Sequence, residues 1–287
     1  MPELPEVEVV RRGLAPAVDG ATVASVEVLD VRSLRRHLGG DFEARLTGSR
    51  LLGPQRRGKF LWIPIAESEE AVVVHLGMSG QVLLREPGVD DARTRIRIDL
   101  EHPAHGALRL NFVDQRIFGS MAIDRLVPAA DHPDELIPSQ VAHIARDPID
   151  PRFDERLFFA RLARKHTSIK RALLDQSLVS GIGNIYADEA LWAARVHYEQ
   201  PTATLSRRRA QALLAEVRLV LDRALAEGGT SFDAQYLNVN GQSGYFAHSL
   251  NAYGQQGKAC PRCGRPIVRE SFMNRGSHFC AHCQRLR

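Results

Sequence analysis

The hydrophobic pattern of this 287-residue chain changes its period once, near the middle, and this change constrains the possible folds most strongly. Before it, expected short strands rich in β-branched residues, one of them over 71–84, are separated by Gly, Pro or charged turns. Two of them, 94–100 and 108–112, alternate apolar with polar residues as half-buried strands do. After it, apolar residues recur at helical spacing. We therefore expect an α+β chain of two domains, a β-sandwich or barrel followed by a helical domain.

The expected elements have recognisable ends. Pro5 suits a first helical position and the acids after it suit a first turn, so we expect a helix over about Pro5–Leu14. In the second half we expect helices in 168–176, after the glycine turn 181–183, and over Ala210–Leu225, with Ser206 as its cap. Proline and aspartate predominate between them, so we place a domain linker over residues 127–151.

The net charge is only +4, but the cations cluster. Residues 156–174 contain six Lys or Arg and no acid, 258–287 contain seven against one acid, and 32–59 contain eight against two. Each block alone is typical of a solvated surface, whereas three together favour a polyanion partner, above all nucleic acid. The apolar stretches are too short to span a membrane and no signal peptide is present, so we expect a cytoplasmic protein.

All four cysteines lie near the C-terminus, in two CxxC pairs sixteen residues apart: Cys260, Cys263, Cys280 and Cys283. This spacing predicts a tetrahedral zinc site. Four thiolates leave no open position, so we expect a structural Zn²⁺ ion. Disulfides are the alternative, which a cytoplasmic setting disfavours. His278 or His282 can replace a cysteine as a ligand, but the two pairs are the simpler arrangement.

The N-terminus offers a second chemistry. Met1 precedes the small residue Pro2, so we expect its removal, which leaves a secondary amine on Pro2. Such an amine titrates near neutrality and attacks an electrophilic carbon to form an iminium, while Glu3 beside it can move protons. On these residues alone, a proline that protects the terminus or precedes a helix is the commoner explanation.

Several motifs now combine, in order along the whole chain: MPELPEVE, QRRGKFL, HLGMSG, DQRIFG, LLDQSLVSGIGNIYADEAL and CPRCG with RGSHFCAHCQR. Together they resemble formamidopyrimidine-DNA glycosylases, bacterial base-excision enzymes that remove 8-oxoguanine and ring-opened purines. The resemblance implies a multidomain α+β fold with an N-terminal β-sandwich and flanking helices, a helix–two-turn–helix domain and a zinc finger. The corresponding ranges are 1–126, the linker 127–151, 152–251 and 252–287, with DNA between the two main domains.

The resemblance also implies a cofactor, partners and a location. It predicts one structural zinc ion, double-stranded DNA with oxidised bases as the partner, a monomer, and the bacterial cytoplasm or nucleoid. The chain would be both a DNA glycosylase and a lyase that cuts at abasic sites. Pro2 resembles the nucleophile that bonds to the sugar C1′, and Glu3 the general acid. Lys59 matches the lysine assigned to β-elimination and Arg275 the arginine assigned to δ-elimination.

The same resemblance predicts the DNA contacts. Because the damaged nucleotide must leave the duplex, other groups must fill its place. Met78, Arg116 and Phe118 are similar to the family's filling residues, with Arg116 facing the orphaned base. Without the resemblance, core packing is the simpler account of Met78 and Phe118. The remaining predicted contacts are His75, Arg93, Lys165 and Asn184, the last at a helix start that can bind phosphate.

Three sites, one of them a pair of residues, depart from the family pattern. Arg93 and Arg95 stand where many members have a His-x-His pair, Ile117 where many have a second arginine, and Asp233 where a basic residue is common. Two alternatives remain open. One is an endonuclease VIII-like glycosylase for oxidised pyrimidines, although that family has Gly in place of Leu4. The other is a non-catalytic zinc-finger DNA-binding protein, which has no need of a free Pro2.

Overall fold

A computed structural model of the protein describes residues 2–230 and 246–287, which divide into two compact units. Residues 2–143 and 228–230 belong to the first, and 144–227 and 246–287 to the second. Asp233 lies outside the described residues. Over the part of the chain that the structure describes, no helix combines the length and apolar character needed to cross a membrane.

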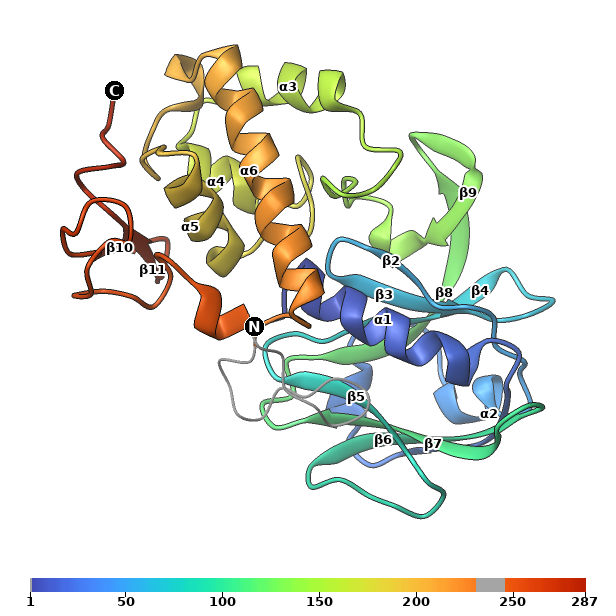
Figure 1. The fold of residues 1–287 in the computed structure, drawn as a ribbon. Coiled ribbons are helices and arrows are strands. Elements are labelled where there is room, and N and C mark those ends of the chain that lie inside the picture. Colours follow the sequence, from blue (N-terminus) through green and yellow to red (C-terminus); the bar gives the residue numbers. More distant parts are fainter. Residues whose placement is uncertain (1, 231–245) are drawn as a thin grey trace. The chain divides into compact units, whose positions relative to one another are not determined.

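Two antiparallel sheets form most of the first unit (Figure 1). One has four strands in the order β1-β6-β7-β5, and the other has five in the order β2-β3-β4-β8-β9. The elements are α1 (Leu4–Val18), β1 (Thr22–Val28), α2 (Phe42–Leu46), β2 (Gln55–Arg57), β3 (Phe60–Pro64), β4 (Glu70–His75), β5 (Gly80–Arg85), β6 (Thr94–His102), β7 (Gly106–Asp114), β8 (Ser120–Ala129) and β9 (His132–Pro138).

One apolar core joins the two sheets and α1. Val7 and Leu14 of α1 meet Val72 of the five-stranded sheet and Ile96 and Phe112 of the four-stranded sheet, and all are buried. The predicted alternation of β6 is confirmed, since every second side chain from Thr94 to Leu100 is buried. Helix α1 runs past the expected end to Val18 despite Pro16. Burial of Ala17 and Val18 offsets the hydrogen bond that this proline cannot make.

Two expected boundaries differ from those in the structure. The stretch 71–84 is not one strand but two, because β4 and β5 belong to different sheets. Strand β9 lies inside the predicted linker 127–151. It is an edge strand that begins and ends near prolines, and an edge tolerates residues that cannot donate to a ladder. The missing periodicity there therefore reflects an edge strand as well as a connection.

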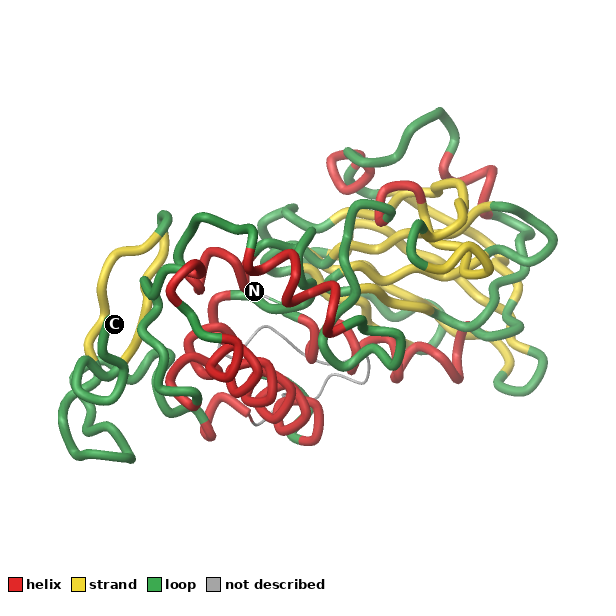
Figure 2. The backbone as a smooth tube through the Cα atoms, turned by 90° about the horizontal axis from the view of Figure 1, so that it is seen from above, coloured by secondary structure: helices red, strands yellow, loops and turns green. Residues whose placement is uncertain are grey.

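Helices make up most of the second unit: α3 (Glu155–Ala163), α4 (Ile169–Leu174), α5 (Asn184–Ala193) and α6 (Arg207–Ala226). The expected cap of α6 is present, because Ser206 Oγ accepts the N–H of Arg209 at 3.4 Å. Gly228 follows the helix with φ +76°, a conformation in which glycine is favoured. Figure 2 shows these helices in red and the hairpin of β10 (Val268–Phe272) and β11 (Arg275–Phe279) in yellow.

Candidate active site, DNA-contacting loops and zinc centre

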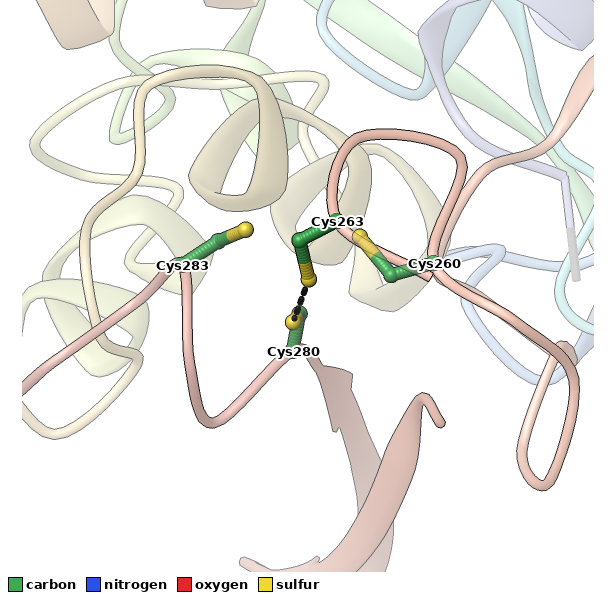
Figure 3. Close-up of side chains that lie close together, drawn as sticks. All are labelled: Cys260, Cys263, Cys280 and Cys283. Carbon is green, nitrogen blue, oxygen red and sulfur yellow. Dashed lines mark hydrogen bonds between the residues drawn. The ribbon is translucent and has the colours of Figure 1, made fainter. Parts of the chain in front are cut away.

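The four cysteines converge on one point (Figure 3). Their sulfur atoms all lie within 4.8 Å of one another, and Cys263 and Cys280 are 3.5 Å apart. Tetrahedral Zn–S bonds of about 2.3 Å place sulfurs about 3.8 Å apart, so the set fits one zinc ion. Neither alternative histidine belongs to this group, because Asp188 holds His278 at 3.2 Å and Arg265 lies 2.7 Å from His282.

Helix α5 supports the zinc site. The Trp192 indole N–H donates to Cys260 Sγ at 3.4 Å, and hydrogen bonds of this kind stabilise a metal-bound thiolate. The Arg262 guanidinium lies 4.2 Å from the centre of the Trp192 ring and donates to the Trp192 carbonyl at 2.9 Å. The tail is thus fastened to the helical unit as well as folded around its metal.

The N-terminal residues lie at the buried start of α1. Pro2 and Glu3 are both buried. One Glu6 carboxylate oxygen accepts the Glu3 N–H at 2.8 Å, and the other accepts the N–H and Oγ1 of Thr230 at 2.7 and 2.9 Å. Gly229 has φ +83°, and a β-carbon there would lie 2.9 Å from Glu6. A single carboxylate therefore fixes the start of α1 and residue 230 together.

Glu8 connects α1 to the turn that contains Lys59. Arg56 of β2 donates to the Glu8 carboxylate at 3.0 Å and to the Gly58 carbonyl at 3.0 Å. Arg11 adds two further bonds to Glu8. Burial alone raises the pKa of Glu8, but the hydrogen bond from Arg11 and the charge of Arg56 outweigh it and lower the pKa to about 2. The ionised carboxylate thus joins the helix after Pro2 to the β2–β3 turn.

His75 at the end of β4 is neutral at physiological pH. Burial, followed by the charges of Arg36, Lys59 and Arg35, lowers its pKa to about 4. Its Nδ1 accepts the N–H of Gly77 at 3.2 Å, which leaves the proton on Nε2. If His75 contacts a phosphate, it therefore donates a hydrogen bond from the uncharged ring through Nε2–H.

Met78 and Phe118 lie on the two loops where the chain crosses between the sheets, 76–79 and 115–119. Their exposed fractions are 43% and 50%, so neither packs in the core. The loops touch at Gly77, where a β-carbon would lie 2.4 Å from the Phe118 backbone. The Arg116 side chain is exposed on the second loop. The structure thus brings these three predicted residues onto paired loops.

Asp114 binds both loops, a role that was not predicted from the sequence. It is fully buried. One carboxylate oxygen accepts from Ser79 Oγ at 2.5 Å and from the Arg116 N–H at 3.1 Å, and the other accepts the Gly119 N–H at 2.6 Å. Asp114 ends a strand at the start of the DQRIFG motif, which is the only local signal of this role.

Arg35 holds the second loop from its other side. Its guanidinium donates to the carbonyls of Ile117 and Gly119 at 2.9 and 2.7 Å, and also to that of Phe118. Ile117 has φ +55°, which is unfavourable for a β-branched residue. The hydrogen bonds that Arg35 donates and Asp114 accepts hold the loop and offset this strain. No sequence pattern near Arg35 predicts this role.

The two arginines that replace the histidine pair differ in their surroundings. Arg95 donates to the Asp114 carbonyl at 2.8 Å and pairs with Asp30 at 3.4 Å. Arg93 is exposed at the rim of a pocket that Gln81 and Gln115 also line. Arg93 is therefore the better placed of the two to reach an external anion.

In the second unit, Asn184 binds the backbone next to Arg275. Asn184 Nδ2 donates to the Gly276 carbonyl at 3.0 Å, so its amide nitrogen is engaged within the protein. Arg275 is exposed at the start of β11 and, among the described residues, makes no side-chain hydrogen bond or ion pair. The connecting turn, Met273 and Asn274, has positive φ at both residues, as a two-residue type I′ turn requires.

Lys165 lies between α3 and α4 in the same unit. It forms a 2.5 Å ion pair with Asp175, whose pKa lies below its usual value because the bonds from Lys165 and Ser177 outweigh the opposing effect of burial. A pocket of about 450 Å³ adjoins it, lined also by Arg161 and Arg164. Contact with a phosphate there would compete with Asp175.

Comparison with known proteins gives a family match for three parts of the chain. The N-terminal domain of formamidopyrimidine-DNA glycosylase matches residues 1–121, its H2TH domain matches 144–235, and the zinc finger found in FPG and IleRS matches 257–286. A formamidopyrimidine-DNA glycosylase of Leifsonia xyli is 64% identical, with all of both chains covered. The chain belongs to the formamidopyrimidine-DNA glycosylase family.

Solved structures agree with this family assignment. A Lactococcus lactis FPG mutant in complex with DNA containing Fapy-dG superposes with a TM-score of 0.85 at 31% identity, covering 99% of this chain and 100% of that one. MutM (FPG) from Thermus thermophilus gives 0.83 at 35% identity, covering 100% of both. The predicted formamidopyrimidine-DNA glycosylase family, its α+β fold with a zinc finger and its one structural zinc ion are confirmed.

Proposed function

We propose that this protein removes oxidised purines from duplex DNA and then cuts the strand at the abasic site. Its assignment as a DNA glycosylase of base excision repair is confirmed, and the observation that supports it most is the match of all three family domains, in order, from residue 1 to residue 286. The choice of 8-oxoguanine and formamidopyrimidines as substrates follows from the family. The alternative, an endonuclease VIII-like glycosylase, would prefer oxidised pyrimidines, and the parallel assay below distinguishes the two.

In our proposal, Pro2 begins the reaction. Its unprotonated nitrogen bonds to C1′ of the sugar as the damaged base leaves, and Glu3 protonates the ring oxygen so that the sugar opens. The product is an iminium, which withdraws electrons from C2′ and makes its proton acidic. Loss of that proton breaks the C3′–O bond and releases the 3′ phosphate.

Lys59 and Arg275 are proposed to act on the two eliminations. Lys59 donates a proton during β-elimination, and Arg275 stabilises the second phosphate as the C5′–O bond breaks in δ-elimination. Water then hydrolyses the imine and frees Pro2. The bonds from Glu8 to Arg56 and from Arg56 to Gly58 support this role of Lys59, because they tie its turn to the helix that follows Pro2.

The DNA contacts are proposed on the same basis. Exposure of Met78 and Phe118 on adjoining loops supports their insertion where the nucleotide has flipped out, with Arg116 facing the orphaned base. His75, Arg93, Lys165 and the start of α5 at Asn184 are proposed phosphate contacts. Zinc, held by the four cysteines, keeps the tail folded and takes no part in the chemistry.

The wider assignments also remain proposals. We propose the domain ranges 1–126, 152–251 and 252–287 with a linker at 127–151, a monomeric protein, and a location in the bacterial cytoplasm or nucleoid. All follow from the resemblance to the family.

A parallel assay tests the substrate. Duplexes containing 8-oxoguanine opposite cytosine and duplexes containing an oxidised pyrimidine are compared under single-turnover conditions. We expect faster excision from the 8-oxoguanine duplex and a gap with phosphate at both ends. Preferential excision of the pyrimidine would contradict the proposed substrate, and binding without excision of either would contradict the enzymatic activity.

A further inference from the structure

A fully buried ion pair in the second unit has no part in the chemistry described above. Lys170 of α4 and Asp188 of α5 are 0% and 1% exposed, and Lys170 Nζ lies 2.6 Å from the Asp188 carboxylate. A buried pair of this kind often stabilises a protein no better than apolar residues of the same volume, because both charges lose their hydration. Stability alone is therefore a weak reason for its presence.

The pair acts on the strand that begins with Arg275. Lys170 Nζ donates to Ser277 Oγ at 3.0 Å and approaches the Gly276 carbonyl at 3.4 Å. The Asp188 carboxylate accepts the backbone N–H of His278 at 2.8 Å and the Ser277 hydroxyl at 3.2 Å. The three residues after Arg275 are thus all held by one buried ion pair.

Asn184 adds a second donor to the Gly276 carbonyl, at 3.0 Å. The Gly276 carbonyl belongs to the peptide bond between Gly276 and Ser277, so these bonds hold the backbone immediately after Arg275, the residue from which the side chain extends. On the other side of Arg275, Met273 and Asn274 have φ of +47° and +60°, a strained turn that the surrounding structure must maintain. Arg275 itself has no side-chain hydrogen bond or ion pair among the described residues, so its direction depends on this backbone.

We propose that Lys170 and Asp188 are positioning residues that aim Arg275 at the phosphate lost in δ-elimination. This inference rests on the proposed function. A shift of about 1 Å in a group that assists a reaction can lower its rate by about a hundredfold. Without the pair, the Gly276 carbonyl loses a donor and the His278 N–H loses its acceptor, so Arg275 no longer has one fixed origin.

The ratio of products separates positioning from general stability. On a duplex with a preformed abasic site, β-elimination alone leaves an unsaturated sugar on the 3′ end, whereas β,δ-elimination leaves a phosphate. Partial unfolding lowers both products in parallel and leaves their ratio unchanged. Misdirection of Arg275 lowers only the second product.

The test uses Asp188→Asn, Ser277→Ala and the double variant Lys170→Met with Asp188→Leu, which removes both charges and keeps the volume. We expect the rate of δ-elimination to fall by about ten- to a hundredfold in the double variant and less in Ser277→Ala. Borohydride-trapped adduct and zinc content per chain should equal those of the unaltered protein. If the double variant does not fold, the product ratios of Asp188→Asn and Ser277→Ala test the positioning role.

The matched control is Glu155→Gln, which breaks an exposed ion pair with Arg218 in the same unit and should leave the ratio unchanged. An unchanged product ratio in every variant of the buried pair, or a parallel fall of adduct and both products, would overturn the positioning role. Absence of adduct with the unaltered protein would instead contradict the proposed function, and this role with it.

Discussion

At the scale of single residues, Met78 and Phe118 are exposed apolar side chains on loops that are themselves firmly held. Replacing Met78 by Ala removes a side chain that would fill the space of the flipped nucleotide. We expect single-turnover excision from duplex DNA to slow by about tenfold, with DNA affinity changed by less than about twofold. Leu38→Ala, at an 81% exposed apolar residue, is the control. An unchanged excision rate would leave Met78 without this role.

Asp114 is the residue on which the two crossover loops depend. Because its carboxylate accepts bonds from Ser79, Arg116 and Gly119 in a buried site, Asp114→Ala should lower the free energy of unfolding by about 3 kcal/mol. The control is Asp99→Ala, which breaks a partly exposed pair with Arg109 and should cost about 1 kcal/mol or less. Urea unfolding measures the free energy of unfolding of both variants. Equal decreases would contradict the role of Asp114 in holding the two loops.

At the scale of elements, the contact between α1 and β2 depends on ionised Glu8. Its pKa is about 2 in the folded protein, below the usual 4.5, so its contribution to stability is complete above pH 4.5 and is lost as the pH falls toward 2. Glu8→Gln should therefore lower the free energy of unfolding by about 2 kcal/mol at neutral pH, allowing for partial solvent screening. The difference between the two proteins should shrink between pH 4.5 and 2. A difference independent of pH would contradict this account.

The zinc tail is a separate element. Its segment is too short for a core of its own, so metal supplies much of its folding free energy. Cys280→Ser or chelation should therefore weaken DNA binding and strand cutting while the β-sandwich stays folded. Circular dichroism and a cutting assay measure these outcomes, and normal cutting by the variant would refute the role of zinc.

Much of this architecture was predictable from local pattern. Alternation indicated β6, helical spacing and Ser206 indicated α6, and cysteine spacing indicated the metal site. Strand β7 lies where it was expected, but its residues 110–114 are all buried rather than alternately exposed. Strand β9 was not predictable, because an edge strand with prolines has no regular alternation. The division of 71–84 into two strands depends on which sheet each half joins, and sheet membership is a long-range property.

The candidate site, like the fold, was only partly predictable from the sequence. Motifs indicated Pro2, Lys59, Met78 and Arg275. They did not indicate Asp114 or Arg35, because these residues act through carbonyls and N–H groups that only the folded backbone assembles. Exposure likewise decided between the two readings of Phe118, since the sequence alone allowed it to be in the core.

At the scale of the whole molecule, residues far along the chain bind the N-terminal helix. Residues 228–230 belong to the first unit although residues 144–227 form the other, and Thr230 binds Glu6 only four residues after Pro2. The start of helix α1 is therefore fixed by a distant part of the sequence. Folding of the first unit therefore uses residues 228–230 as well as residues 2–143.

The most direct test of the whole account is to trap the enzyme on 8-oxoguanine DNA with borohydride, digest the adduct and locate the modified residue by mass spectrometry. We predict that the DNA is bonded to the nitrogen of Pro2, in a peptide that lacks Met1. Attachment to Lys59 or another lysine, or full activity in molecules that all retain Met1, would contradict it.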